Sequence, residues 1–332
     1  MKLSFTFAAL EWRFGYEKSI GLIRDAGFDA FDYSLDCMVK DDSPFNGADW
    51  REHARRIRTA ADAAGLCINQ THAPFSFSVS RLWSNDTAYR EIIFPRIRRA
   101  LEISGIFGAD VCVVHPIHHG VYAGHEEELF RRNMAFYREL LPTALRAGVR
   151  IGVENMYQSD PRRGYLVDDT CSRAEEFCRY IDTLNHPRIV ACLDLGHVGL
   201  VAHQEEAWDV IRALGHDRLC ALHVHDNDYR GDQHQLPYIG KMDWAKITQA
   251  LGEIDYQGDF TYENGWAFLS GMDEEFLPTA LRYMADVGRH LMRCIDGNRP
   301  GEGCRKTLGR CPKPRLEPSF GEGSKNSKNL TG

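Results

Sequence analysis

The ten residues Leu145-Arg146-Ala147-Gly148-Val149-Arg150-Ile151-Gly152-Val153-Glu154 show the pattern that is most informative about the fold. They complete a helical pattern over Glu126–Ala147, pass through Gly148 and continue as a short β-rich run that ends in Glu154. A glycine between a helix and a strand is typical of a left-handed helix C-cap, because glycine adopts positive φ without steric cost. The stretch therefore predicts one α-to-β connection, and the same arrangement recurs along the chain.

Short β-rich runs alternate with helical patterns up to about residue 293, and Gly27, Gly65, Gly108 and Gly215 occupy places like that of Gly148. The eight expected strands are Leu3–Ala8, Phe28–Tyr33, Cys67–His72, Val111–His115, Val149–Glu154, Ile189–Asp194, Leu219–His225 and Asp259–Glu263. The other helical patterns are Trp50–Ala64, Thr87–Phe107, Ser172–Leu184, Glu205–Leu214, Asp243–Leu251 and Asp273–Met292. Eight such units with mostly apolar strands predict a parallel (β/α)8 TIM barrel. An open doubly wound sheet is the alternative, but no GxGxxG motif follows the first strand.

The composition divides the chain into residues 1–296, expected to form the barrel, and residues 297–332. The second segment has low sequence complexity, with 8 Lys and Arg against 3 Asp and Glu, and we expect a disordered basic tail. The remaining residues hold 32 basic and 44 acidic side chains, which gives this part a net charge of −12. An acidic body disfavours nucleic acid as a partner, because duplex DNA is itself a dense polyanion.

No run of apolar residues is long enough to span a bilayer, and the first residues lack the pattern of a secretory signal. The ten cysteines form no CxxC pair, and several lie in apolar strand-like runs, which favours buried free thiols over disulfides. We therefore expect a cytoplasmic protein without a membrane partner. A homodimer is compatible with the sequence, since homo-oligomers are common among such enzymes.

Metal-binding residue types end six consecutive predicted strands, at the face where TIM barrels place their active sites. The six residues are His72, His115, Glu154, Asp194, His223 and Glu263, and the following loops add His197, Asp232 and His234. Buried carboxylates and imidazoles gathered in one ring would repel each other or lack partners without a cation. The sequence therefore predicts a divalent metal site, with Mn²⁺, Mg²⁺, Co²⁺ or Zn²⁺ as the ion.

These strand ends resemble the xylose isomerase-like TIM barrels of the sugar phosphate isomerase/epimerase group, over about residues 1–293. In the ketose 3-epimerase branch, the resemblance implies that Glu154, Asp194, His223 and Glu263 hold one divalent ion. It further implies that Glu154 and Glu263 are the catalytic acid/base pair, and that His197 contacts the substrate. Such an enzyme removes a proton next to a carbonyl, and the metal stabilises the resulting enediolate.

Two alternatives remain open within the same group. An inosose dehydratase-type lyase shares the barrel, the metal and the first proton abstraction. Endonuclease IV, a tri-zinc apurinic-site phosphodiesterase, uses nine ligands, and this chain has a matching residue for each: His72, His115, Glu154, Asp194, His197, His223, Asp232, His234 and Glu263. The acidic body argues against DNA as the substrate, and the Arg-rich helices are expected on the outer ring. A sugar or sugar-derived small molecule is the expected substrate.

Further residues near the strand ends are candidates for substrate binding. The aromatic side chains that offer apolar walls are Trp12, Phe14, Phe75, Phe77, Tyr157 and Trp266. Arg162 and Arg163 after the fifth strand, and Arg230 with Lys241 after the seventh, are candidates for binding a phosphate or carboxylate. Of these sets, Trp12, Arg162 and Arg230 are the principal predictions.

Overall fold

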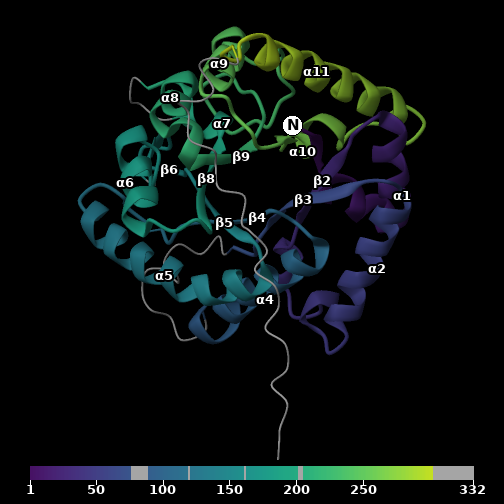
Figure 1. The fold of residues 1–332 in the computed structure, drawn as a ribbon, viewed down its shortest axis with the longest axis horizontal. Helices are drawn as coiled ribbons and strands as arrows, with labels where there is room; N and C mark the ends of the chain where they lie inside the picture. Colours follow the sequence, from purple (N-terminus) through teal and green to yellow (C-terminus); the bar gives the residue numbers. More distant parts are fainter. Residues whose placement is uncertain (76–88, 119, 161, 201–204, 302–332) are drawn as a thin grey trace, which may run out of the picture.

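The computed structural model describes residues 1–75, 89–118, 120–160, 162–200 and 205–301 (Figure 1). Eight parallel strands form one sheet in the order β10-β1-β2-β3-β4-β5-β8-β9. Their bounds are β1 Leu3–Thr6, β2 Ala30–Ser34, β3 Cys67–His72, β4 Val111–Val114, β5 Arg150–Glu154, β8 Ile189–Asp194, β9 Leu219–His223 and β10 Phe260–Tyr262. Each predicted strand is therefore present, with ends that differ from the prediction by at most two residues.

The sheet closes on itself between β9 and β10. Val224, directly after β9, forms a parallel bridge with Tyr262. Its backbone N–H donates to Thr261 O at 2.9 Å, and its carbonyl accepts from the N–H of Glu263 at 3.1 Å. These contacts join the two ends of the strand order, so the predicted TIM barrel is confirmed.

A ring of helices surrounds the barrel (Figure 1). The ring consists of α1 Ala8–Ala26, α2 Trp50–Ala63, α4 Phe94–Phe107, α5 Glu126–Ala147, α6 Ala174–Leu184, α8 Ala207–Arg218, α9 Trp244–Glu253 and α11 Leu277–Gly297. The predicted helix Thr87–Phe107 begins, within the described residues, as the π-helical turn η3 Tyr89–Ile93, which runs directly into α4. The first turns of α4 and α11 contain Pro95 and Pro278, at positions where a missing backbone N–H costs nothing.

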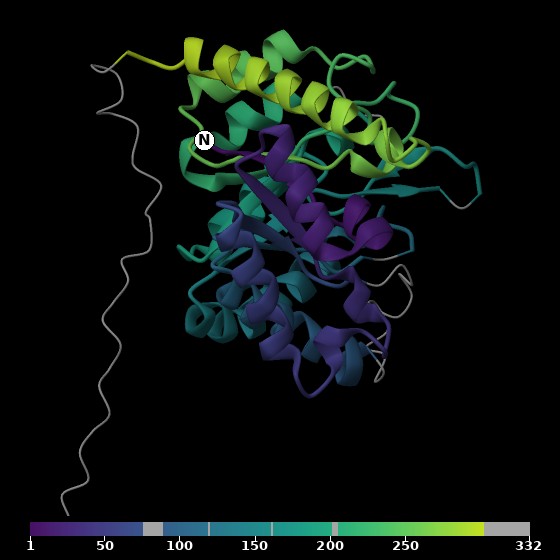
Figure 2. The same cartoon turned by 90° about the vertical axis from the view of Figure 1, so that its right-hand side faces the viewer.

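Shorter elements follow several of the strands and were not predicted. They are the helices α7 Leu195–Val198 and α10 Gly265–Leu269 and the 3-10 turns η1 Asp36–Val39 and η2 Pro44–Asn46. An antiparallel hairpin, β6 Tyr157–Ser159 with β7 Leu166–Asp168, follows β5. In Figure 2 this hairpin projects from the side of the molecule opposite the N-terminus, where the strands end.

The glycines expected between helices and strands all have positive φ, between 67° and 93°: Gly27, Gly65, Gly108, Gly148 and Gly215. Gly27, Gly108 and Gly148 are left-handed C-caps, which let the chain leave a helix and enter the next strand within a few residues. Gly215 differs from the expectation, because its ψ of −173° is not left-handed and it forms a kink inside α8. A sixth, Gly15 with φ 73°, interrupts α1, so the segment before it forms a separate short helical turn above β1.

The barrel interior is filled by small apolar side chains beneath the predicted ligands. Val111, Val113, Val190, Cys192, Cys220 and Ala221 form a compact cluster of their own. Gly152 belongs to the same layer, since an added Cβ would lie 2.9 Å from Val111 Cγ1 and 3.2 Å from Cys192 Cβ. Side chains two residues apart share a strand face. The inward positions Gly152, Cys192 and Ala221 are therefore followed, one step toward the strand ends, by Glu154, Asp194 and His223.

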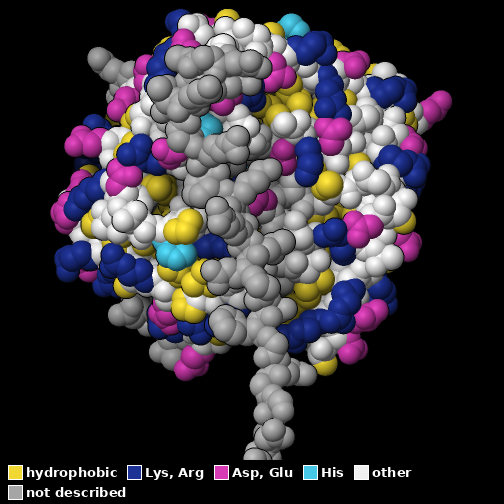
Figure 3. Space-filling view, viewed as in Figure 1, with side chains coloured by type: hydrophobic (Ala, Val, Ile, Leu, Met, Phe, Trp, Pro, Cys, Tyr) yellow, Lys and Arg dark blue, Asp and Glu magenta, His cyan; other side chains and the backbone are white. Residues whose placement is uncertain are grey.

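The outer helices carry most of the basic side chains. On the face shown in Figure 3, Lys and Arg lie mainly around the periphery and alternate with Asp and Glu. Arg51 pairs with Glu102 at 3.1 Å and Arg58 with Asp62 at 2.8 Å, both on exposed surface. This agrees with the expectation that the Arg-rich stretches are solvated helix faces.

The eight described cysteines are all free, while Cys304 and Cys311 fall outside the described residues. The predicted basic tail also lies almost entirely outside them. Within the described part of the chain, no helix combines the length and hydropathy that a membrane span requires.

A buried carboxyl on α1 makes the stability of the fold depend on pH. Glu11 accepts a hydrogen bond from Tyr33 Oη of β2, and burial raises the pKa of Glu11 from 4.5 to about 6. The folded state therefore favours the protonated carboxyl, and this contribution to stability is lost as the pH rises from about 4.5 through 6. We expect Glu11→Gln to increase the free energy of unfolding at pH 7.5 by about 2 kcal/mol.

Urea unfolding at pH 4.5 and pH 7.5 tests this expectation. Glu17→Gln, on the exposed side of the same helix, is the control, and it should leave the difference between the two pH values unchanged. An equal effect of Glu11→Gln at both pH values would show that ionisation of Glu11 is not the cause.

Candidate metal centre

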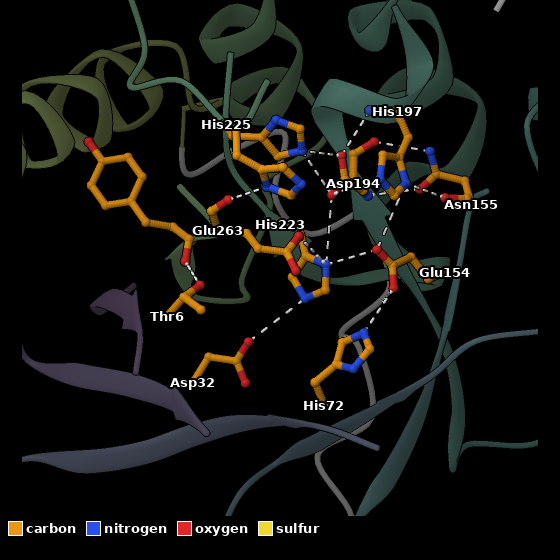
Figure 4. Close-up of polar contacts among 12 residues, drawn as sticks. Thr6, Asp32, His72, Glu154, Asn155, Asp194, His197, His223, His225 and Glu263 are labelled. Atoms are coloured by element: carbon orange, nitrogen blue, oxygen red, sulfur yellow. Dashed lines mark hydrogen bonds and ion pairs between the residues drawn. The ribbon is translucent and has the colours of Figure 1, made fainter. Parts of the chain in front are cut away.

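Four side chains converge where the barrel strands end (Figure 4). Glu154, Asp194 and His223 are the last residues of β5, β8 and β9, and Glu263 directly follows β10. One ligand atom from each lies within 4.8 Å of the others. The four residues predicted to hold a metal therefore meet at one point above the apolar layer of the barrel.

His223 lies at the middle of this group. Its Nδ1 is 2.9 Å from Glu154 Oε1, 3.1 Å from Glu263 Oε2 and 3.8 Å from Asp194 Oδ2. The side chains of His223 and Asp194 are fully buried, whereas that of Glu263 retains 22% exposure toward the cavity. One imidazole nitrogen among three carboxylates is a donor set that suits a hard or borderline divalent cation.

An unpartnered atom and charge repulsion test whether the site fits a cation. His223 Nε2 is buried without a hydrogen-bond partner. Burial, together with the carboxylates of Asp194 and Glu154, raises the pKa of Glu263 well above its ordinary value. Burial also opposes ionisation of Glu154, but the imidazoles of His223 and His115 outweigh it and lower the pKa of Glu154. The four groups therefore fit a divalent cation, which would neutralise the excess negative charge.

A second group of ligand atoms shares Glu154. His115 Nε2 lies 3.0 Å from Glu154 Oε2, and His72 Nε2 lies 2.9 Å from His115 Nε2. Burial lowers the pKa of His115 to about 4, so this imidazole is neutral and able to bind a metal at physiological pH. The ligand atoms of these three residues also lie within 4.8 Å of one another.

The remaining predicted residues lie on the other side of the four-residue group. His234 Nε2 is 2.9 Å from Asp232 Oδ2, and His197 Nε2 is 3.8 Å from the same oxygen. His197 N–H donates to Asp194 Oδ1 at 2.8 Å, and its Nδ1 lies 2.8 Å from Asn155 O. The structure therefore brings all nine sequence-predicted ligand positions around one site.

A cavity of about 750 Å³ opens above these residues. Trp12 and Trp266 form part of its wall, with ring centroids 4.4 Å apart in an edge-to-face arrangement. Phe75 and Tyr157 also line it, as predicted, whereas Phe77 lies outside the described residues. The volume is that of a small-molecule site.

The described residues that line the cavity include no lysine or arginine, and six of them are acidic: Asp32, Asp36, Glu154, Asp169, Asp232 and Glu263. The structure thus places neither Arg162 nor Arg230 in the lining. Arg162 lies on the turn of the unpredicted β6–β7 hairpin, where its N–H donates to Asp160 Oδ1 at 2.7 Å. The N–H of Arg230 likewise donates to Asp228 Oδ1 at 3.0 Å, on an exposed loop. The prediction that these arginines bind the substrate has no support from this geometry.

Several residues of the site were missed by the sequence analysis. His225 Nε2 lies 2.9 Å from Asp194 Oδ1, and Asp32 Oδ2 of β2 lies 3.9 Å from His223 Nε2. Both had a signal in the sequence. His225 lies two residues after His223 and therefore shares its side of the strand. Asp32 lies two residues after Ala30 and therefore shares the side of Ala30 in β2. Asn155 ties the ends of β5 and β8 together, since it donates to Asp194 O and accepts from Asp194 N–H.

A model of the family "Xylose isomerase-like TIM barrel" matches residues 20–285. The chain belongs to this family. The resemblance seen in the strand ends is thereby confirmed. A curated relative of the chain, D-psicose 3-epimerase of Enterocloster bolteae, is 27% identical over 267 residues, or 76% of this chain and 78% of the relative.

Solved structures named as ketose 3-epimerases or as similar to them share the fold. D-psicose 3-epimerase from Clostridium cellulolyticum H10 with D-tagatose has a TM-score of 0.66 at 18% identity, covering 88% of this chain and 99% of that one. A D-tagatose 3-epimerase-like protein has a TM-score of 0.67 at 18% identity, covering 90% and 99%. At this level of identity the likeness establishes the architecture.

Asp32 provides a test of the metal assignment. A metal-binding imidazole normally donates its second N–H to a carboxylate, which fixes the ring and strengthens the ligand. Asp32 is the buried carboxylate that faces His223 Nε2, and both His223 Nε2 and Asp32 Oδ1 lack a hydrogen-bond partner. We expect Asp32→Asn to weaken the binding of Mn²⁺ or Co²⁺ by roughly 10- to 100-fold in calorimetric titration.

Asp36→Asn is the matched control, because Asp36 lines the same cavity but faces His72 Nδ1 at 3.5 Å instead of His223. It should leave the affinity of the first ion unchanged. Unaltered metal affinity in Asp32→Asn would contradict the assignment of His223 as a ligand through Nδ1.

Proposed function

We propose that this protein is a divalent-metal-dependent sugar isomerase or epimerase, with catalysis in the barrel of residues 1–296. One observation carries the proposal. Two glutamates, Glu154 and Glu263, flank the same buried imidazole at 2.9 and 3.1 Å at the base of a cavity. Such a pair provides both proton-transfer groups that the reaction needs, next to the residues that fit a metal.

The two glutamates reach the site from different parts of the barrel. Glu154 ends β5, and Glu263 follows β10, with β8 and β9 between them in the sheet. Figure 4 shows them on opposite sides of His223. A sugar carbon held above His223 would therefore be open to one carboxylate from each side.

This arrangement matches the chemistry of proton transfer next to a carbonyl. A divalent cation held by Glu154, Asp194, His223 and Glu263 would supply a positive charge that stabilises negative charge developing on the substrate oxygens. One glutamate takes the proton from carbon. The other returns a proton to the opposite face for epimerisation, or the proton returns to the adjacent carbon for isomerisation.

The character of the cavity supports a sugar without phosphate or carboxylate groups. Among the described lining residues there is no Lys or Arg to pair with an anion, while Trp12 and Trp266 offer an apolar wall. The curated relative is named for epimerisation of D-psicose, a ketose. We therefore propose a ketose or a related sugar as the substrate class, and a divalent metal as the cofactor.

Isotope exchange tests the proposed reaction. The Mn²⁺-loaded protein, incubated with D-psicose, D-tagatose or D-fructose in D₂O, should incorporate deuterium next to the carbonyl and form an epimer or isomer. A lyase would instead release water and a dehydrated product, which mass spectrometry detects. We expect Glu154→Gln and Glu263→Gln each to lower kcat by at least about 100-fold.

Glu139→Gln, on the outer surface of α5, controls for unspecific effects, and the metal content of each variant should be measured beside its activity. Undiminished exchange in both active-site variants would remove Glu154 and Glu263 from the mechanism. Deuterium exchange that persists after the bound metal has been removed by chelation would contradict the proposal of a metal cofactor.

A second candidate function rests on the group formed by His72, His115 and Glu154. These residues offer another set of ligand atoms within 4.8 Å, as a multi-zinc phosphodiesterase of the endonuclease IV type requires. The absence of Lys and Arg from the described lining disfavours a polyanionic substrate.

Metal content measured together with abasic-site nicking separates the two functions. We expect about one tightly bound divalent ion per chain by elemental analysis, and no nicking of a duplex with an abasic site. About three zinc ions with nicking would instead establish the phosphodiesterase.

A further inference from the structure

A histidine–aspartate pair lines the cavity outside the metal centre. His118 follows β4 and Asp169 follows β7, and His118 Nδ1 lies 2.7 Å from Asp169 Oδ2. The Asp169 side chain is 1% exposed and that of His118 is 12% exposed. The pair therefore has a buried carboxylate and an imidazole that retains access to the cavity.

Both partners are fixed by further hydrogen bonds. Asn133 of α5 accepts from Ile117 N–H at 2.6 Å and donates to Ile117 O at 3.1 Å, which anchors the backbone next to His118. Asp169 Oδ1 accepts from the N–H of Thr170 at 2.7 Å. Thr170 O in turn accepts from the N–H of Met156 at 3.0 Å, next to the end of β5. The imidazole is thus held in one orientation before any substrate binds.

The second ring nitrogen is the group available to a ligand. Because Nδ1 donates its proton to the carboxylate of Asp169, Nε2 is the ring nitrogen that can accept a hydrogen bond. Within the described part of the chain no residue hydrogen-bonds to Nε2, and His118 lines the cavity. A hydroxyl group is the sugar substituent that donates to such an acceptor.

The pair also has a defined position relative to the rest of the site. His118 lies beyond His115, with ring centroids 6.3 Å apart, so it is separated from the four-residue metal group by one imidazole. The strand order places β4 and β5 across the barrel from β10 and β1, whose following segments carry Trp266 and Trp12. The cavity therefore has an aromatic side and, opposite it, a side with an oriented acceptor.

We propose that His118, oriented by Asp169, forms a subsite that binds a hydroxyl group of an uncharged sugar, on the side of the cavity opposite Trp12 and Trp266. The inference rests on the proposed function for the position of the reacting carbon at the metal group. His118 acts here as a specificity-determining residue, and Asp169 as the positioning residue that keeps Nε2 an acceptor. The subsite makes the enzyme select among sugars by a hydroxyl remote from the reacting carbon.

Substitution of each partner separates recognition from folding. His118→Phe keeps a planar ring but removes the acceptor, so KM for the preferred ketose should rise roughly 10- to 100-fold with kcat within about threefold. In Asp169→Asn the side-chain amide N–H can donate to Nδ1, so the ring proton moves to Nε2, which becomes a donor that a sugar hydroxyl can still accept from. Asp169→Asn should therefore raise KM less than His118→Phe does. His290→Phe, on the exposed face of α11, is the control.

Deoxy sugars identify the bound hydroxyl. Dissociation constants for D-psicose, D-tagatose and their monodeoxy derivatives are measured by calorimetry on metal-loaded wild type and His118→Phe. One monodeoxy derivative should bind the two proteins with equal affinity, while its parent sugar favours wild type. Metal content should be the same in all variants.

The outcomes separate this inference from the proposed function. If wild type converts a ketose but His118→Phe has unaltered KM and Kd, the subsite is refuted and the enzyme activity stands. If a ketose binds without conversion and His118→Phe weakens its binding, the subsite stands and the isomerase is refuted. If wild type neither binds nor converts any of these sugars, both are refuted.

Discussion

Repulsion among the carboxylates around His223 determines how the rest of the site is arranged. Glu154, Asp194 and Glu263 all present oxygens to one imidazole nitrogen, with little solvent to screen them. The protein compensates by raising the pKa of Glu263 and by gathering His72, His115 and His225 around the other two carboxylates. A divalent cation held here would convert this mutual repulsion into shared coordination.

The barrel makes this concentration of charge possible. Small inward residues, Gly152, Cys192 and Ala221, fill the interior directly below Glu154, Asp194 and His223. These three candidate ligands therefore lie on parallel strands, where hydrogen bonds on both sides fix the backbone, and Glu263 directly follows β10. Asn155 strengthens this support by joining the ends of β5 and β8. Precise ligand positions are what a metal-assisted proton transfer requires.

The sequence predicted the barrel and the convergence of nine site residues because both follow from short-range patterns. Alternation of strand and helix, glycine at helix ends and polar residues at strand ends are local signals, and strand ends of a parallel barrel share one face. The β6–β7 hairpin was not predicted, and it carries Arg162 away from the cavity. Asp32, His118 and Asp169 were missed as well. The last two become a pair only through the hairpin and through Asn133, contacts between segments far apart in the sequence.

We propose that Glu154, Asp194, His223 and Glu263 together hold one divalent cation in this family member. Anomalous diffraction from crystals of the Mn²⁺-loaded protein locates the ion. We expect one strong anomalous peak in coordinating contact with all four side chains, with His223 binding through Nδ1. A crystal in which the strong peak lies elsewhere, or in which these four side chains remain without an ion at saturating Mn²⁺, would contradict it.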